Sequence, residues 1–440
     1  MTLVRALSLD TIEAVFKEGA YSNLKVNEVL KQEQLNANDR GLYTTLVYGT
    51  IQRKITLDYY LKPFLKTKIK GWVRRLLWMS IYQYVYMDKI PTHAIINEAV
   101  ALAKKRGGQQ TGNTVNAILR RMTSETLPTF STIKNDIERL SIAYSIPQWI
   151  IKHWKTHYGL ETTEMIAQEM LKPVPQTVRV NKTHTTVNEV KQQLELEGFH
   201  VERDAHLDVC LHVSQGSIIH SSLFKSGKIS IQDKSSMFVG ALLAPNQGDH
   251  ILDCCSAPGG KACHTAEILH GTGHVEATDV HPHKIALIQH NIDKLNLKNI
   301  STYVHDATQP YDTHYDKIIV DAPCSGLGVL RHKPEIKYMM TEQDVTSLVD
   351  LQLQILENVS QHLKEGGTLV YSTCTIEQME NENVIYTFLK AHPDFEFEIF
   401  ESPKSNERVK TLQILPQDFN TDGFFITKIR RKEHSNDHCR

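Results

Sequence analysis

The sequence has 440 residues, of which 41% are hydrophobic and 22% are charged, the proportions of a globular protein with two or three domains. No apolar run approaches the roughly 18 residues that a membrane helix needs, and the N-terminus lacks the apolar core of a signal peptide, so a cytoplasmic protein with no membrane partner is expected. Five of the seven cysteines lie between residues 254 and 374, a distribution that favours reduced thiols over a disulfide framework.

The formal net charge of −1 hides an uneven distribution. Residues 1–130 hold 19 Lys and Arg against 10 Asp and Glu, whereas the rest of the chain is acidic. A basic segment beside an acidic one suggests a module that binds a polyanion. The alternative is that these lysines only solvate helix faces.

The apolar spacing over residues 1–130 is helical and predicts an all-α domain. Gly107-Gly108, directly after Lys104-Lys105-Arg106, is expected to end a helix, because cations and glycine are favourable at helix C-termini. Residues 131–172 are expected to form a helical connector, with Pro147 in the first turn of a helix.

Residues 173–235 predict a small α+β module, with a strand at 177–181, a helix at 187–197 and a further strand near 201. From 236 to 432 strands alternate with helices, the pattern of a parallel sheet with crossover helices and therefore of a Rossmann-like α/β domain. Residues 433–440 are expected to form a polar tail. The strands are expected to end near Asp253, Asp279, Asp306, Asp321 and Cys374.

A glycine-containing turn follows the strand that ends near Asp253 and precedes a predicted helix. Glycine at such a turn lets a ligand approach main-chain N–H groups, which suits a nucleotide-like cofactor. The full G-x-G-x-x-G pattern is absent. The residues of the turn are Cys255, Ser256, Ala257, Pro258, Gly259, Gly260 and Lys261.

Two aspartates follow the next strands of the predicted sheet. Asp279 is placed to accept hydrogen bonds from a ribose diol, and Asp306 is placed to accept one from an adenine amino group. Taken singly, each is explained as a turn or cap residue. Their recurrence after successive strands favours a ligand site, because ligands of open parallel sheets bind beyond the carboxyl ends of the strands.

The segment Asp321-Ala322-Pro323-Cys324 and the cysteine of Ser372-Thr373-Cys374 are expected to bring a carboxylate and two thiols into one cleft. This set suits methylation of carbon 5 of cytosine, because a thiolate that adds to carbon 6 makes carbon 5 nucleophilic. Cys374 is the better nucleophile candidate. Asp321 is expected to stabilise charge on the ring edge, and Cys324 to assist elimination.

These motifs resemble those of the S-adenosylmethionine-dependent RNA cytosine-C5 methyltransferases, the NOL/Nop/Sun group. Further stretches match the same group: Arg179-Val180-Asn181, Gln232-Asp233-Lys234-Ser235-Ser236 and Asp422-Gly423-Phe424-Phe425. Residues 1–130 resemble the NusB family of RNA-binding domains. Together they make the chain similar to the RsmB (Sun, Fmu) branch, with an RRM-like small module.

The resemblance implies methylation of one cytosine of 16S rRNA with S-adenosylmethionine as the methyl donor. A monomer is expected. The resemblance assigns cofactor contacts to residues 255–261, Asp279, Asp306 and Asp321, the nucleophile to Cys374 and release to Cys324. Methylation of tRNA or of another rRNA cytosine is the alternative within this class. A non-catalytic RNA-binding assembly or antitermination factor is the alternative of another class.

Other enzyme classes explain fewer of these residues. A Rossmann dehydrogenase accounts for Asp279 but not for Cys324 or Cys374. A DNA cytosine methyltransferase would make Cys324 the nucleophile and leave Cys374 without a role.

Two further clusters of residues are candidate sites. A metal site at Cys254, Cys255, Cys263 and His264 lacks a C-x-x-C pair, so no metal is expected. The basic run Arg331-His332-Lys333 is either an exposed loop or a contact to RNA phosphate.

Overall fold

The computed structural model describes residues 2–433, and the chain divides into two compact units. The first unit takes in the chain up to Lys172 together with Leu330–Thr341. The second takes in Pro173–Val329 and the chain from Glu342 onward. The expected polar tail at 433–440 lies, apart from Glu433, outside the described residues.

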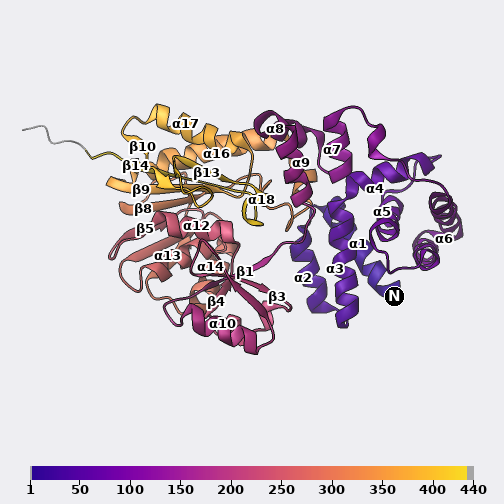
Figure 1. Ribbon diagram of the computed structural model, residues 1–440, viewed down its shortest axis with the longest axis horizontal. Helices are drawn as coiled ribbons and strands as arrows, with labels where there is room; N and C mark the ends of the chain where they lie inside the picture. The colour runs from indigo at the N-terminus through magenta and orange to yellow at the C-terminus, as the bar shows by residue number, and fades with distance from the viewer. Residues whose placement is uncertain (1, 434–440) are drawn as a thin grey trace, which may run out of the picture. The chain divides into compact units, whose positions relative to one another are not determined.

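The first unit is helical throughout, as the apolar spacing predicts (Figure 1). Buried side chains recur at helical spacing, for example Val73, Leu76, Leu77 and Ile81 on α5, and they form one continuous core. The helices are α1 (Thr2–Glu18), α2 (Ser22–Gln32), α3 (Ala37–Gln52), α4 (Lys54–Leu61), α5 (Gly71–Tyr86), α6 (Thr92–Ser124), α7 (Asp136–Tyr144), α8 (Gln148–Tyr158) and α9 (Leu160–Glu169), with short 3-10 turns η1 (Lys62–Phe64) and η2 (Phe130–Thr132).

The helix end predicted at Gly107-Gly108 is a kink inside α6, which continues to Ser124. Gly108 has φ +81° and ψ 177°, which is not helical. A residue with a side chain is strained at this φ, so glycine is required where the helix changes direction.

A segment from the later half of the sequence completes the helical unit. Leu330–Thr341, which includes α15 (Ile336–Met339), places the buried carboxylate of Glu335 where it accepts hydrogen bonds from the backbone N (3.0 Å) and Oγ (2.6 Å) of Ser22. Lys337 Nζ donates to the carbonyl of Gln52 at 2.8 Å. Burial lowers the pKa of Lys337 to about 7.

Arg331, in the same segment, is also buried and lies 3.2 Å from Glu169. It is therefore not the exposed basic residue that both sequence interpretations assumed.

The small α+β module opens the second unit. Its four-stranded antiparallel sheet has the order β2-β3-β1-β4. Thr186 and Glu189 form a reciprocal capping box at the start of α10, which fixes the N-terminus of that helix. The elements are β1 (Gln176–Val180), α10 (Val187–Leu196), β2 (His200–Arg203), β3 (Cys210–Ser214), η3 (Ile218–His220), α11 (Ser222–Lys225) and β4 (Ile229–Ile231).

The large sheet has the order β10-β14-β9-β8-β5-β6-β7, and β13 pairs with part of β14. The pairs among β5 to β9 are parallel, as predicted, whereas β14 returns antiparallel between β9 and β10. Its strands are β5 (His250–Asp253), β6 (His274–Asp279), β7 (Ile300–Val304), β8 (Tyr315–Asp321), β9 (Leu363–Thr373), β10 (Phe395–Phe397), β13 (Thr411–Ile414) and β14 (Phe424–Arg431), and β11 (Phe400–Glu401) pairs with β12 (Arg408–Val409).

Helices cover both faces of this sheet (Figure 1). Neighbouring strand residues such as Ile251 and Leu252 point to opposite faces and belong to two separate cores. One core contains residues of α12, α13 and α14, and the other contains residues of α16 and α17. The helices are α12 (Lys234–Leu243), α13 (Gly260–Ile268), α14 (Pro282–Lys294), α16 (Glu342–Gln361), α17 (Glu382–Ala391) and α18 (Pro416–Phe419), with the turn η4 (Gln378–Glu380).

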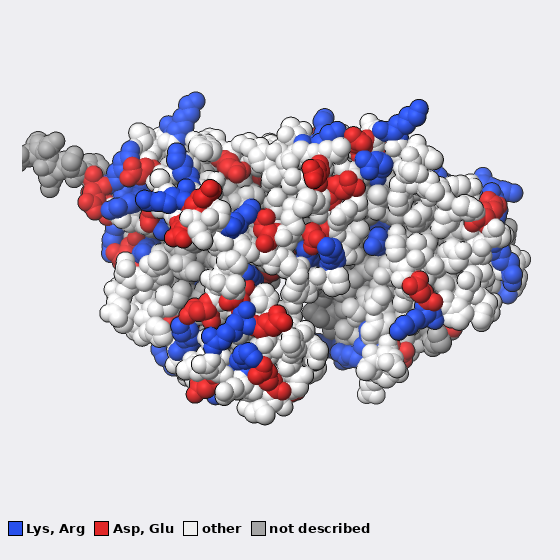
Figure 2. Space-filling model, viewed as in Figure 1, with Lys and Arg blue, Asp and Glu red and all other residues white. Residues whose placement is uncertain are grey.

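Helix composition and surface charge can both be compared with the sequence expectations. Within residues 2–433, no helix combines the length and the apolar character that crossing a membrane requires. Figure 2 shows Lys and Arg side chains interspersed with Asp and Glu on the face in view. On that face the positive charge does not form one continuous patch.

Candidate active site

The turn between β5 and α13 lies at the carboxyl edge of the large sheet. The backbone N of Ser256 donates to the carbonyl of Thr278 on β6 at 2.8 Å, which fixes the turn against the next strand. Gly259 has φ +99°, and a Cβ there would lie 3.1 Å from Cγ2 of Ile288. The left-handed backbone therefore favours glycine, and the space beside it is tight for a side chain. The turn leads directly into the N-terminus of α13, where main-chain N–H groups attract ligands.

The structure places the two predicted aspartates differently. Asp279, at the end of β6, is buried, and its carboxylate accepts from the backbone N of Ala257 (3.4 Å) and of His281 (3.1 Å). It therefore adjoins the glycine turn. Asp306 is exposed and accepts from N and Oγ1 of Thr308, at 2.9 and 2.8 Å, which are the contacts of a turn-forming aspartate.

Asp321 is held by two side chains at the end of β8. Lys261 Nζ lies 2.7 Å from Oδ2 of Asp321, and Ser372 Oγ donates to Oδ1 at 2.9 Å. Burial is the largest single influence and acts to lower the pKa of Lys261, but the charge and hydrogen bond of Asp321, together with the charges of Cys374 and Asp253, outweigh it, so the pKa stands above the ordinary value. The turn residue Lys261 and the carboxylate of the Asp321 motif therefore form one ion pair.

Asp253 lies behind this pair, and the sequence interpretation gave it no role. It is fully buried, and burial followed by repulsion from Asp321 raises the pKa of Asp253 to about 7. A buried carboxylate next to a second one is a recognisable sign of a functional site. The signal in the sequence was its position at a strand end, which Asp279 and Asp321 share.

We expect Asp253→Asn to stabilise the protein at pH 8 and to have less effect at pH 5. The folded-state pKa of Asp253 is about 7, whereas an unfolded aspartate titrates at about 3.9. Between these values the folded state binds more protons than the unfolded state, so the stability contributed by this group is lost as the pH rises through 7. Thermal unfolding midpoints of both proteins at the two pH values measure the difference. An identical pH dependence would contradict the assignment.

The two candidate thiols lie side by side. Cys324 follows β8 and Cys374 follows β9, and these strands are parallel neighbours in which Asp321 pairs with Ser372. The Sγ atoms of Cys324 and Cys374 are 3.4 Å apart. The hydrogen bond to Cys374, and then burial, raise the pKa of the Cys324 thiol well above its ordinary value.

A close backbone approach fixes the position of Cys374. The N of Gly328 donates to the carbonyl of Cys374 at 3.0 Å, and the N of Gly423 donates to the carbonyl of Gly328 at 2.9 Å. A Cβ on Gly328 would lie 2.0 Å from the carbonyl oxygen of Gly423 and 2.7 Å from that of Cys374. The glycine that follows the Cys324 motif is therefore required for packing, and Gly423 of the Asp422 motif belongs to the same contact.

Of the remaining cysteines near the turn, Cys254 and Cys255 have Sγ atoms 3.9 Å apart, and Cys263 is buried. Burial raises the pKa of Cys263 to about 12, and the hydrogen bond to Cys255 followed by burial raises that of Cys254. Among the described residues, the groups whose possible ligand atoms lie within 4.8 Å of one another do not include Cys254, Cys255, Cys263 or His264. The thiols at 254 and 263 pack in the two cores of the sheet as small apolar side chains.

Arg179 of the small module reaches the glycine turn, and its contacts there were not visible in the sequence. It is 1% exposed, donates to both carboxylate oxygens of Glu267 on α13 at 2.8 and 2.7 Å, and donates to the carbonyl of Gly260 at 3.0 Å. It also hydrogen-bonds Gln232. The Arg179 and Gln232 motifs are therefore parts of one buried cluster that supports the turn.

Replacement of Arg179 by methionine is expected to lower the free energy of unfolding by about 3–5 kcal/mol, because Glu267 is left as an unpaired buried charge. The double variant Arg179→Met/Glu267→Met is expected to recover most of that loss, because no charge stays buried. Denaturant unfolding of the full chain measures both. A double variant less stable than Arg179→Met would show that the pair stabilises through more than charge compensation.

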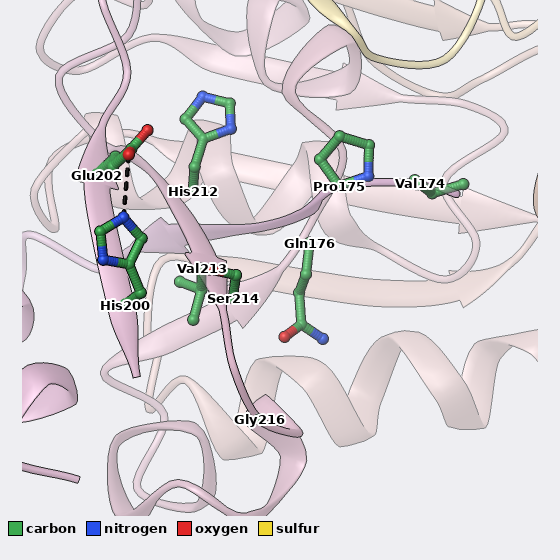
Figure 3. A pocket seen from close by; sticks show the side chains of 9 residues that line it. All are labelled: Val174, Pro175, Gln176, His200, Glu202, His212, Val213, Ser214 and Gly216. Carbon is green, nitrogen blue, oxygen red and sulfur yellow. Dashed lines mark hydrogen bonds and ion pairs between the residues drawn. The ribbon is translucent and has the colours of Figure 1, made fainter. Parts of the chain in front are cut away.

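A pocket on the small module is separate from these residues (Figure 3). It is lined by residues of β1, β2 and β3 and of the adjoining loops, among them His200, Glu202 and His212. Nε2 of His200 lies 3.0 Å from Glu202. None of the candidate catalytic or cofactor residues lines it, so the pocket does not belong to the candidate active site.

The strand order of the large sheet, with one antiparallel strand inserted beside β9, and the glycine turn at its carboxyl edge define a Rossmann-like methyltransferase. The chain belongs to the family described as 16S rRNA methyltransferase RsmB/F, whose model matches residues 240–430. The NusB family model matches residues 2–124, and the ferredoxin-like domain of the RsmF/B-like methyltransferases matches residues 146–220. The predicted fold class and the predicted family are confirmed.

Similarity extends over nearly the whole chain. It is 42% identical to "Probable ribosomal RNA small subunit methyltransferase B" of Bacillus subtilis, over 98% of this chain and 99% of that protein. It is 31% identical to ribosomal RNA small subunit methyltransferase B of Shewanella oneidensis, over 98% of this chain and 100% of that protein. The crystal structure of PH0851 matches 98% of both chains with a TM-score of 0.83 and 25% identity.

Proposed function

We propose that this protein transfers a methyl group from S-adenosylmethionine to carbon 5 of a specific cytosine in 16S rRNA. The observation that carries the proposal is the pair of thiols, Cys324 and Cys374, 3.4 Å apart beside the Asp321–Lys261 ion pair. A Rossmann dehydrogenase has no use for either thiol. The family and the names of its relatives support a ribosomal RNA substrate.

The residues of the glycine turn fit S-adenosylmethionine. Gly259 keeps the turn free of a side chain where its backbone is left-handed, and the turn opens the N-terminus of α13. Asp279 adjoins the turn as an acceptor for a ribose diol. The bound cofactor supplies an electrophilic methyl group. Asp306 lies one strand further along the sheet and is assigned to the adenine end.

The chemistry then falls to side chains of this chain. The Cys374 thiolate adds to carbon 6 of the cytosine, which forms a thioether and places electron density on carbon 5. Asp321, held by Lys261 and Ser372, passes the proton that Cys374 loses to the ring nitrogen, which neutralises the charge that develops there. Once Cys374 is bound in the thioether, it no longer raises the pKa of Cys324 through their hydrogen bond and its charge, which favours the Cys324 thiolate. After methylation the ring nitrogen returns its proton to Asp321, the Cys324 thiolate removes the proton on carbon 5, and the electron pair of that bond expels Cys374 and restores the ring.

The target base must leave its stack to reach a thiol at a strand end, so it lies in a loop or is flipped out of a helix. Mapping 5-methylcytosine in ribosomal and transfer RNA from cells with and without this protein tests the proposal. Loss of one 16S site, restored by the wild-type chain and not by Cys374→Ala, is expected. Loss confined to transfer RNA would give the alternative substrate, and no change in either RNA would favour the non-catalytic alternative.

A further inference from the structure

A buried carboxylate that the reaction above does not use lies behind the two thiols. Glu380, on the turn η4 after β9, is 0% exposed. Its Oε1 accepts from the backbone N of Ser325 at 2.8 Å, and its Oε2 accepts from Oγ of Ser325 at 2.5 Å. Ser325 is the residue directly after Cys324, so this carboxylate is bonded twice to the Cys324 loop.

The same cluster is bonded to the Cys374 loop. Oγ of Ser325 lies 2.9 Å from Oγ1 of Thr375, the residue directly after Cys374. The hydroxyl of Tyr371, on β9, donates to the carbonyl of Glu380 at 2.7 Å and fixes the backbone of η4 against that strand. Glu380 therefore bonds directly to the residue after Cys324 and, through the Ser325 hydroxyl, is linked to the residue after Cys374.

A third contact holds the residue before Cys324. Nε2 of Gln352, on α16, donates to the carbonyl of Pro323 at 2.8 Å and to Oε1 of Glu380 at 3.1 Å. The loop around Cys324 is thus held on both sides of the thiol. Burial raises the pKa of Glu380 although the hydrogen bonds of Ser325 act to lower it. Burying a carboxylate here is unfavourable by itself. The hydrogen bonds that the carboxylate accepts compensate by fixing the positions of the two loops that carry the thiols.

We propose that Glu380 is a positioning residue for methyl transfer: through Ser325 and Thr375 it holds Cys324 where it reaches the proton on carbon 5 of the adduct formed by Cys374. This role rests on the proposed function. It predicts that removing the Glu380 carboxylate slows release of the methylated RNA from Cys374, the step that depends on Cys324, more than it weakens binding of cofactor or RNA.

The test compares wild type, Glu380→Gln and Glu377→Gln. Glu377 is a second buried glutamate three residues earlier, whose side chain caps the backbone N of Met379, so its replacement is matched in chemistry and burial. Glu380→Gln is expected to lower kcat by about 10- to 100-fold, the scale of a displaced reacting group, with KM for RNA and cofactor within about two-fold of wild type. A covalent protein–RNA adduct is expected to accumulate during turnover and to appear on denaturing gels. Glu377→Gln is expected to show neither effect.

The adduct separates positioning from folding, because a partly unfolded enzyme loses activity without accumulating it. Ser325→Ala, which removes only the hydroxyl bonded to Glu380 and Thr375, is expected to accumulate the same adduct if Glu380→Gln does not fold. Unchanged kcat in Glu380→Gln, or a lower kcat without adduct in both variants, would overturn the role of Glu380. Activity in Cys374→Ala together with no adduct in Cys324→Ala would instead overturn the proposed function, whatever Glu380→Gln does.

Discussion

Replacing Cys374 by alanine is expected to abolish methyl transfer, with a loss in kcat of about 10⁴-fold or more, because carbon 5 of cytosine is not activated without a thiolate at carbon 6. Cofactor affinity is expected to stay within about two-fold of wild type, because the glycine turn and Asp279 belong to β5, α13 and β6. Transfer of a radiolabelled methyl group to 16S rRNA measures the first quantity, and calorimetric titration with S-adenosylmethionine measures the second.

Cys210→Ala is the matched control for that substitution. Cys210 is a buried thiol of the small module, and burial raises its pKa to about 12, so it is no nucleophile at neutral pH. The control is expected to retain activity. Full activity in Cys374→Ala would show that another group attacks the base.

Replacing Cys324 by alanine is expected to trap a covalent complex with RNA. Cys374 still attacks and carbon 5 is still methylated, but the base that removes the carbon 5 proton is gone, so the thioether persists. The thiol at 324 lies 3.4 Å from Cys374, close enough to act on the same ring. A band of slower mobility on a denaturing gel, formed with RNA and cofactor and absent from Cys374→Ala, measures the adduct.

The opposite pattern decides between the two thiols. An adduct in Cys374→Ala and none in Cys324→Ala would make Cys324 the nucleophile, as expected for a DNA cytosine methyltransferase arrangement. The double variant forms no adduct under either assignment and serves as the blank for the gel.

Local sequence patterns predicted those parts of the fold that depend on residues near one another in the chain. The helical spacing of the first 130 residues and the strand ends at Asp253, Asp279 and Asp321 follow from side-chain period and from turn residues. The glycines at 107 and 108 predicted a helix end, where the structure has a kink within α6. Because parallel strands end at one edge of a sheet, the juxtaposition of Cys324 and Cys374 also followed from these local patterns.

Contacts between distant segments were not predictable in this way. Glu335 is bonded to Ser22, 313 residues away, and Arg179 to Glu267, 88 residues away. Nothing in the local periodicity of 330–341 indicates that this segment belongs to the helical unit. A fragment of residues 1–130 would therefore lack side chains of Leu330–Thr341 that pack within the helical unit. The buried glutamate at 380 reads locally as a polar turn residue, and only the fold brings it to Ser325.

RNA containing 5-fluorocytidine at the target position tests the central claim most directly, because fluorine on carbon 5 cannot be removed as a proton and the methylated adduct cannot break down. We expect the protein to become covalently attached to this RNA when S-adenosylmethionine is present, and peptide mapping to place the attachment at Cys374. Attachment at Cys324, or an attachment that forms equally well in Cys374→Ala, would contradict the account.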